Sequence, residues 1–310
     1  MVGVVSATTP PADVRGLVEE AERIGNWSAD TRYWSIVDTL VEMPLPDGFG
    51  LSQHLCASDS PALRRLGAHL IAEMAVRGLR RHTQFSEDAI DELLLLTSPD
   101  EDVDVLSSAI GAAGRLGGRS LRRAVLGNLR HPSPAVRTAV AVALPALSGG
   151  VDDHEVVRAL IILTQDGNAV VRDFATFSLG SETDSDAASV REALRQRLDD
   201  DDAATRDEAL IGLARRGDAA TRDLVIGRLR AGSLDEGVIE AAAELADTAA
   251  LALLRARRAV LPPSHPVAAA LDRAIEACSR GERSPHTAAR HPVARHPAVG
   301  HLAARHAASS

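Results

Sequence analysis

The sequence contains no lysine, and all 34 of its Lys+Arg residues are arginine. This absence excludes chemistry that needs a lysine amine, such as a Schiff base, a Walker-type phosphate loop or a Ser–Lys dyad. Aromatic residues are also scarce: only seven of the 310 residues are Phe, Tyr or Trp, so Ala, Leu and Val carry most of the 45% hydrophobic content. Such a composition favours helices over sheets.

Cysteines and long apolar runs are scarce as well. Cys56 and Cys278 lie far apart, without the spacing of a C-x-x-C or zinc motif, which argues against a disulfide framework or a structural metal. Residues 1–11 lack the cationic and apolar regions of a secretory signal, and no later run is long enough to span a membrane. We therefore expect a cytoplasmic protein with no membrane partner.

The negative charge is concentrated in the body of the chain. The formal net charge is −9, but residues 280–310 contain five arginines and one glutamate, so residues 1–279 carry −13. A strongly acidic surface opposes a phosphate backbone. We expect no nucleic-acid partner.

An internal repeat dominates the sequence. Six amphipathic segments of one design recur at intervals of 32 to 40 residues, and their third residues are Arg32, Arg64, Asp104, Arg137, Arg172 and Arg206. Further helical segments, such as 156–163 and 190–198, lie between them. The connections are rich in Pro, Asp, Ser and Gly, as suits a turn followed by a helix N-cap.

A two-helix unit of this length buries its apolar face only by stacking on its neighbours. The pattern predicts an all-α fold, an α-solenoid of two-helix repeats that forms a right-handed superhelix. We expect about seven to eight helix pairs over residues 12–279. A flexible N-terminus (1–11) and a disordered tail rich in Ala, Arg, His and Pro (280–310) would flank them.

The repeats resemble a known family. The stretch from Asn168 to Gly180 reads NAVVRDFATFSLG and is similar to the HEAT-repeat pattern D-x-x-V-R-x-x-A-x-x-A-L-G. The chain looks like the bacterial HEAT-like proteins named for the repeats of phycobiliprotein (PBS) lyases. This resemblance implies HEAT-like two-helix repeats over about 12–279, and it says little about function.

The arginine row, Arg32, Arg64, Arg137, Arg172 and Arg206, has two readings. It could form a cationic ladder for carboxylate or phosphate ligands, or it could be structural. In HEAT-like repeats the matching arginine commonly pairs with an aspartate in the preceding turn, and Asp59, Asp166 and Asp200 stand at such positions. We expect a structural role.

Two groups of residues are candidates for binding a partner. Asp173, Thr176, Asp207 and Leu210 occupy equivalent offsets on adjacent repeats, where a mixed acidic and apolar strip on the concave face would suit a basic segment. The carboxylates alone could instead be a solvated acidic face. Trp27, Tyr33 and Trp34 could anchor a partner or cap the first repeat.

No catalytic motif emerges, so we predict no catalytic residue and no cofactor. Whether the protein is an enzyme stays open, and the sequence favours a protein that is not one. A single His154–Glu155 pair argues against the di-iron HEAT-repeat hydroxylases. His286, His291, His296, His301 and His306 recur in the tail, where weak metal binding is chemically plausible. The leading hypothesis is a non-enzymatic scaffold that binds another protein. The alternatives are a lyase or chromophore-chaperone subunit and, disfavoured by charge, a DNA glycosylase.

Overall fold

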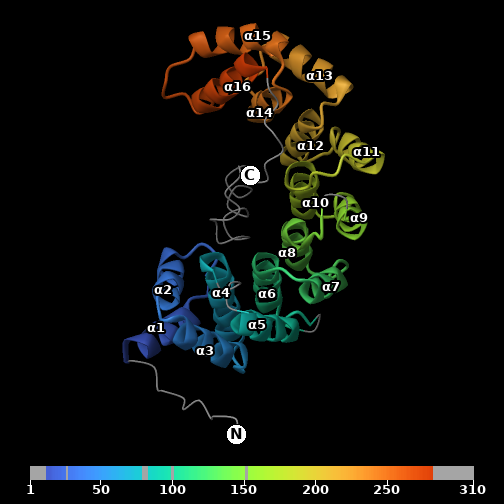
Figure 1. Cartoon of the computed structure of the whole chain (residues 1–310). Helices are drawn as coiled ribbons and strands as arrows, with labels where there is room; N and C mark the ends of the chain where they lie inside the picture. The colour runs from blue at the N-terminus through green and yellow to red at the C-terminus, as the bar shows by residue number, and fades with distance from the viewer. Residues whose placement is uncertain (1–11, 26, 79–82, 99–100, 151–152, 282–310) are drawn as a thin grey trace. The chain divides into compact units, whose positions relative to one another are not determined.

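The computed structural model describes residues 12–25, 27–78, 83–98, 101–150 and 153–281 (Figure 1). In these ranges every regular element is helical: sixteen α-helices, one 3-10 turn and one π-helical turn. The prediction of an all-α fold is confirmed. The terminal segment 1–11 and the histidines of the tail lie outside the described residues.

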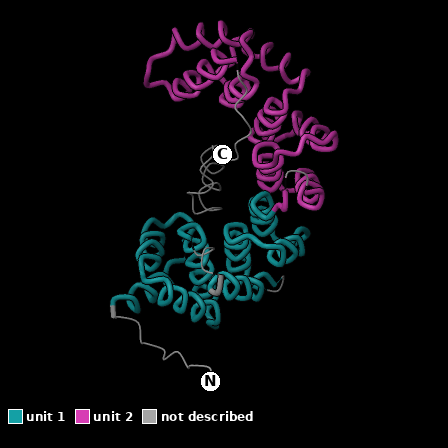
Figure 2. Tube along the Cα trace, in the orientation of Figure 1, with its two compact units in different colours: residues 1–147, 293–310 teal, residues 148–292 magenta. Residues whose placement is uncertain are grey.

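The described residues divide into two compact units (Figure 2), unit 1 up to Leu147 and unit 2 from Ser148 onward. The helices of unit 1 are α1 Ala12–Arg23, α2 Thr31–Val41, α3 Leu45–Cys56, α4 Pro61–Arg77, α5 Thr83–Leu96, α6 Val103–Leu116, α7 Arg119–Gly127 and α8 Pro134–Ala143, followed by the 3-10 turn η2 Pro145–Leu147. Those of unit 2 are α9 His154–Leu163, α10 Ala169–Phe177, the π-helical turn η3 Ser178–Glu182, α11 Ala188–Arg197, α12 Ala203–Arg215, α13 Ala219–Arg230, α14 Glu236–Leu245, α15 Thr248–Ala259 and α16 Ala268–Arg280.

Each unit consists of two layers of helices. In unit 1, α2, α4, α6 and α8 pack side by side in order, and α3, α5 and α7 form the second layer. In unit 2, α10, α12, α14 and α16 pack in order, with α9, α11, α13 and α15 beside them. The six segments of the sequence repeat are α2, α4, α6, α8, α10 and α12. We call the helices with even numbers the even layer and the others the odd layer.

Aspartate N-caps begin many of the helices, as the polar connections predicted. Asp30 accepts hydrogen bonds from the main-chain N–H groups of Arg32 and Tyr33 at the start of α2. Asp102, Asp153, Asp202, Asp218 and Asp247 cap α6, α9, α12, α13 and α15 in the same way. Each cap satisfies N–H groups that have no partner inside the helix. These caps fix where the helices of successive repeats begin.

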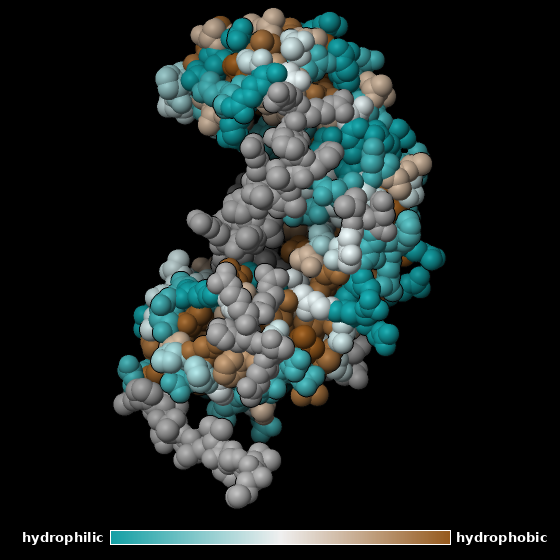
Figure 3. Space-filling view, viewed as in Figure 1, coloured by the Kyte–Doolittle hydropathy of each residue, from teal (hydrophilic) through white to brown (hydrophobic). Residues whose placement is uncertain are grey.

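Small residues bring neighbouring helices close together. A Cβ atom on Gly67 of α4 would lie 2.7 Å from the Sγ atom of Cys56 in α3, and one on Gly212 of α12 would lie 2.7 Å from Gly180 Cα in η3. The backbones meet because these positions carry no side chain. On the surface in Figure 3, hydrophilic residues cover α7 and α9, and apolar residues gather over α5 and α6.

Candidate functional site

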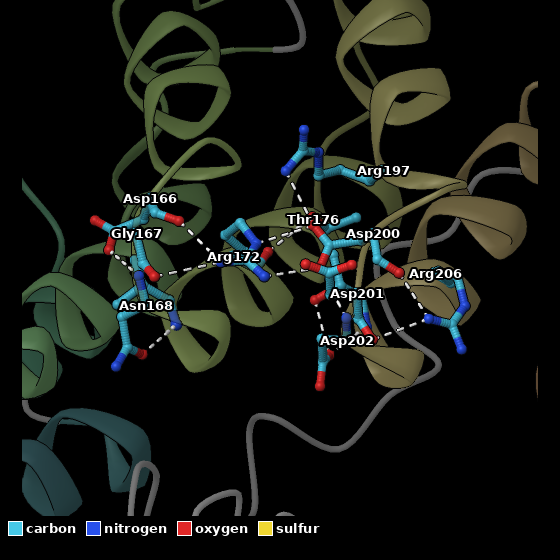
Figure 4. Close-up of polar contacts among 12 residues, drawn as sticks. Asp166, Gly167, Asn168, Arg172, Thr176, Arg197, Asp200, Asp201, Asp202 and Arg206 are labelled. Atoms are coloured by element: carbon cyan, nitrogen blue, oxygen red, sulfur yellow. Dashed lines mark hydrogen bonds and ion pairs between the residues drawn. The ribbon is translucent and has the colours of Figure 1, made fainter.

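Arg172 connects two consecutive repeats of unit 2 (Figure 4). Its Nη1 group donates hydrogen bonds to the main-chain oxygens of Asp166 (3.1 Å) and Gly167 (3.5 Å), in the turn before α10. Its Nε and Nη2 groups donate to the two carboxylate oxygens of Asp200 at 2.9 and 2.8 Å. One guanidinium therefore closes its own interhelical turn and binds the turn before α12 in the next repeat.

Asp200 is the buried centre of this network. Its side chain is 2% exposed, and it also pairs with Arg197 Nη1 at 3.0 Å and accepts a hydrogen bond from the main-chain N–H of Asp202. Burial opposes ionisation of the carboxyl group, but the hydrogen bonds from Arg172 and Asp202 and the nearby arginine charges outweigh it, so the pKa of Asp200 is lowered. The carboxylate stays ionised at neutral pH.

The contact with the preceding turn recurs along the arginine row. In Arg64, Arg137 and Arg206 the Nη1 group again donates to the main-chain oxygens five and six residues upstream, at 2.6 to 3.1 Å. Carbonyl groups at the end of a helix lack partners within it, so the arginine satisfies groups that the fold would otherwise leave open. This contact has the same geometry in four repeats and lies within the turn of each repeat.

The carboxylate partners differ from the expected ones. Arg64 binds Glu101 of the following repeat through Nε (3.1 Å) and Nη2 (2.6 Å), just as Arg172 binds Asp200 downstream. Arg32 binds Glu20 of α1 with two bonds of 2.8 Å. In the preceding turns, three arginines of the row bind main-chain carbonyl oxygens and not the expected carboxylates. The pairs are Arg64 with Asp59, Arg172 with Asp166 and Arg206 with Asp200.

A cleft of about 480 Å³ opens beside the Arg172 network. It is lined by Gln165, Asp166, Arg172, Gln196, Arg197, Asp199, Asp200 and Asp201. Both of its arginines bind Asp200, so their charge is engaged within the structure. The cleft offers a polar surface, to which Asp199 and Asp201 also contribute.

The strip expected at Asp173, Thr176, Asp207 and Leu210 does not form on the surface. Thr176 and Leu210 are 0% and 1% exposed, and Asp173 is buried as well. The Thr176 hydroxyl donates to the main-chain oxygen of Arg172, and Leu210 belongs to the apolar core of unit 2. The physical reason is that the residue four positions after the row arginine points into the helix packing in every repeat. Its other members, Ile36, Ala68, Ser108 and Ala141, are buried too.

Asp207 is the member of this set that keeps contact with solvent. It is half-buried on α12, and its carboxyl group lies over the first turn of α14, where a Cβ atom on Gly237 would be 2.5 Å from Asp207 Oδ1. Burial, together with repulsion from the nearby Asp235, raises the pKa of Asp207 to about 6, and Arg228 and Arg206 offset only part of this. Among the described residues no hydrogen bond or ion pair holds this carboxyl group.

The aromatic residues Trp27, Tyr33 and Trp34 form one cluster with a histidine that the sequence did not point to. The ring of His69 on α4 lies 4.8 Å from Trp27 and 4.9 Å from Trp34, centroid to centroid. Tyr33 is fully buried, and its hydroxyl is 2.8 Å from His69 Nδ1. Burial and the charges of two arginines hold the pKa of His69 well below its usual range, so its ring is neutral. Trp27 and Trp34 stay half-exposed.

Sequence reasoning also missed a buried arginine. Arg216, at the end of α12, donates hydrogen bonds to main-chain oxygens of Leu179, Gly180, Thr183, Ser185 and Gly212 at 2.6 to 3.0 Å. Burial lowers its pKa to about 10. The adjacent Arg215 binds Asp184 at 2.9 Å and the main-chain oxygen of Ser181. In the sequence, Arg215 and Arg216 only stand out as a pair of arginines at the end of a helical segment, just before Gly217.

The described residues hold neither a cluster of metal ligands nor an exposed thiol. They contain no group of three His, Cys, Asp or Glu side chains placed to hold a metal ion. Cys56 and Cys278 are both buried free thiols, and burial raises their pKa values to about 12 and about 11. Within the same residues, no helix is both long and apolar enough to cross a membrane.

Comparisons with known proteins support the repeat assignment. Residues 90–180 match the family model of HEAT repeats. The structure resembles YibA of Escherichia coli, with a TM-score of 0.57 and 19% identity over 88% of this chain and 99% of that one. It also resembles Kap95p in complex with RanGDP, with a TM-score of 0.50 and 11% identity over 88% of this chain and 40% of Kap95p.

A weaker likeness joins the chain to the CpcE–CpcF complex of phycocyanin lyase from Nostoc sp. PCC7120. The TM-score is 0.46, with 16% identity over 74% of this chain and 93% of that one. None of the curated proteins matches the chain. At these identities the likenesses concern the fold.

Proposed function

We propose that this chain is a non-enzymatic scaffold that binds a basic segment of another protein, as suits a chain whose residues 90–180 match HEAT repeats. The proposed surface is the even layer of unit 2, at α12 and α14. A solenoid presents the surfaces of successive helices side by side, which suits an extended or helical partner segment. No lyase activity is proposed, since the likeness to phycocyanin lyase is weak and concerns the fold.

The observation that carries the proposal is the unneutralised carboxyl group of Asp207. Its raised pKa means that ionisation at neutral pH costs free energy, because the group is half-buried and is repelled by the charge of Asp235. Arg172 and Arg197, by contrast, both form ion pairs with Asp200 within the structure. A cationic side chain of a partner would relieve the repulsion between Asp207 and Asp235 and would gain an ion pair shielded from water.

The apolar part of the surface shifts by one residue from the sequence-based expectation. Leu210 is in the core, but Ile211, the next residue of α12, is only partly buried against that core. It lies one turn after Asp207 on the same helix, so the two side chains are neighbours. Charge would guide the approach of the partner, and the apolar contact would add affinity.

The test is site-specific photo-crosslinking of the full-length protein in its native host. A photoreactive residue replaces Ile211, and the matched control replaces Glu192, whose side chain is 60% exposed on α11 in the odd layer. The proposal expects one protein to be captured through position 211 and not through position 192, by a segment rich in Arg or Lys.

A charge series completes the test. The double variant Asp207→Asn and Asp235→Asn should bind the captured segment more weakly and with a smaller salt dependence. Asp223→Asn, which removes an exposed carboxylate from α13, should bind as the wild type does. Equal capture from both positions, or unchanged affinity and salt dependence in the double variant, would overturn the proposal.

A further inference from the structure

The repeat pattern breaks at one place in unit 1. The position that holds arginine in five repeats is Asp104 in α6, and the preceding repeat carries a second arginine, Arg65, directly after its row arginine. Needs of stacking recur in each repeat. A pair of residues that departs from the pattern therefore calls for another explanation, and the two are neighbours in space: Arg65 Nη1 and Asp104 Oδ2 are 3.9 Å apart.

Arg65 is a buried cation without a close counter-ion. It is 6% exposed, and its guanidinium carbon lies 5.2 Å from the centre of the Trp27 ring and 5.7 Å from that of Tyr33. These rings supply cation–π attraction. Its Nε and Nη2 atoms nevertheless have no hydrogen-bond partner among the described residues. A buried charge in this state is costly, and an anion that accepted its hydrogen bonds would lower that cost.

Asp104 meets this demand only in part. Its carboxylate accepts a hydrogen bond from Trp27 Nε1 at 3.3 Å and lies 3.9 Å from Arg65, while its side chain is 56% exposed. Charge-assisted hydrogen bonds are normally about 2.7–2.9 Å long. Asp104 therefore approaches two donors, an indole N–H and a guanidinium, without binding either of them closely.

We infer that Trp27 and Arg65 form a binding site for a carboxylate group, and that Asp104 is a weak internal occupant of this site. The ligand is a free carboxylate, either of a small organic acid or at the C-terminus of a peptide. The guanidinium fork matches the two oxygens of a carboxylate, and one cation beside Asp104 is too little charge for a phosphate dianion. The Tyr33 hydroxyl is 2.8 Å from His69 Nδ1 and also interacts with Arg65, so it lies beside the proposed site.

This site lies in unit 1 and goes beyond the proposed function. It concerns an anionic ligand, whereas the surface at α12 and α14 concerns a basic one. The two inferences use different residues and can fail independently.

The sequence provides a built-in reporter for the test. Its two tryptophans, Trp27 and Trp34, both belong to this cluster, so the tryptophan fluorescence of the full-length protein reports on this site alone. Asp104→Asn removes the competing charge and keeps the side-chain size. Acetate and a short peptide with a free C-terminus should then bind about tenfold more tightly than to the wild type. The amidated form of the peptide should not bind.

Matched variants separate the site from general effects of charge. Glu73→Gln removes a carboxylate from another ion pair between α4 and α6, 4.0 Å from Arg115, and should leave acetate affinity unchanged. In the Asp104→Asn background, Trp27→Phe removes the N–H donor but keeps a ring, and Trp34 still reports. This variant should lose the affinity gained, as should Arg65→Met.

If Arg65→Met does not fold, Trp27→Phe decides the question by itself. Tight binding of acetate only would identify a small acid as the source, and tight binding of the free-terminus peptide only would identify a chain end. The inference is wrong if Asp104→Asn gains no affinity for either probe, or if the amidated peptide binds as well as the free one.

Discussion

The guanidinium of Arg172 binds both carboxylate oxygens of Asp200, 28 residues downstream, through two hydrogen bonds of 2.9 and 2.8 Å. The side chains are 16% and 2% exposed, so this ion pair is largely shielded from water. It joins the start of α10 to the turn before α12. The pair therefore fixes how one repeat of unit 2 sits on the next.

Arg172→Ala should lower the free energy of unfolding by roughly 3 kcal/mol, because it leaves the buried carboxylate of Asp200 with Arg197 as its remaining ion-pair partner. Urea denaturation followed by circular dichroism measures the change. The control is Arg15→Ala, which breaks an ion pair whose side chains are 79% and 57% exposed and should cost less than about 0.5 kcal/mol. Equal losses in the two variants would contradict a structural role for the row.

Asp207 should make the protein less stable as the pH rises. Its folded-state pKa of about 6 lies above the ordinary value of 3.8, so between these values the folded state binds more protons than the unfolded state. Stability from this group falls as pH rises through that window. Asp207→Asn should therefore stabilise the protein by about 1–2 kcal/mol near pH 7.5, after allowance for partial exposure, and by almost nothing near pH 4.

Urea midpoints at the two pH values check this prediction. Asp223→Asn, at an exposed carboxylate of α13, is the control and should show no such difference. A stabilisation by Asp207→Asn that is the same at both pH values would mean that relief of charge is not its cause.

Arg216→Met should loosen the turn that precedes α11. The substitution keeps the apolar stem but leaves the carbonyl groups of η3 and the following loop without their donor. We expect a loss of about 3–5 kcal/mol. Amide hydrogen exchange of residues 181–186 should accelerate. This measurement detects local loosening of the turn, which a thermal melt of the whole protein does not separate from global destabilisation. Arg255→Met, at an exposed residue of α15, should leave exchange in this segment as it is.

Gly212→Ala should destabilise unit 2 by about 1–3 kcal/mol, since the new Cβ atom would lie 2.7 Å from the backbone of Gly180. Gly227→Ala provides a contrast within α13, because nothing lies within 4 Å of a Cβ atom there. That change should stabilise the helix by about 0.5–1 kcal/mol. Thermal melts of both variants test the sign of each stability change. A Gly212→Ala variant as stable as the wild type would show that α12 and η3 can separate at little cost.

Much of the fold could be read from the sequence because helix periodicity and capping are local. The apolar spacing and the polar residues before the segments indicated helices that the structure contains, from α2 with its Asp30 cap to α13 with its Asp218 cap. The structural reading of the arginine row rested on repetition, and the recurring carbonyl contacts of Arg64, Arg137 and Arg206 give that reading a physical basis.

The candidate sites were less predictable, because they depend on which side of a helix faces its neighbour. Thr176 and Leu210 were expected on the surface, but a comparison of the same offset across the repeats finds apolar or small residues throughout, which signals packing. The contacts of His69 and Asp104 with the aromatic residues could not be read from the sequence, since the partners lie 36 and 77 residues apart.

The sequence by itself determined the helical repeat, its period and its caps, since these depend on spacing along one chain. Only the tertiary structure decided which charges find partners. The packing of the helices brings Asp200 next to Arg172 and surrounds Arg216 with carbonyl oxygens. The same packing leaves Asp207 near Asp235 and leaves Arg65 without a close anion. The reason is physical: the energy of a charge depends on its burial and its neighbours, and both are set by residues that are remote in the sequence.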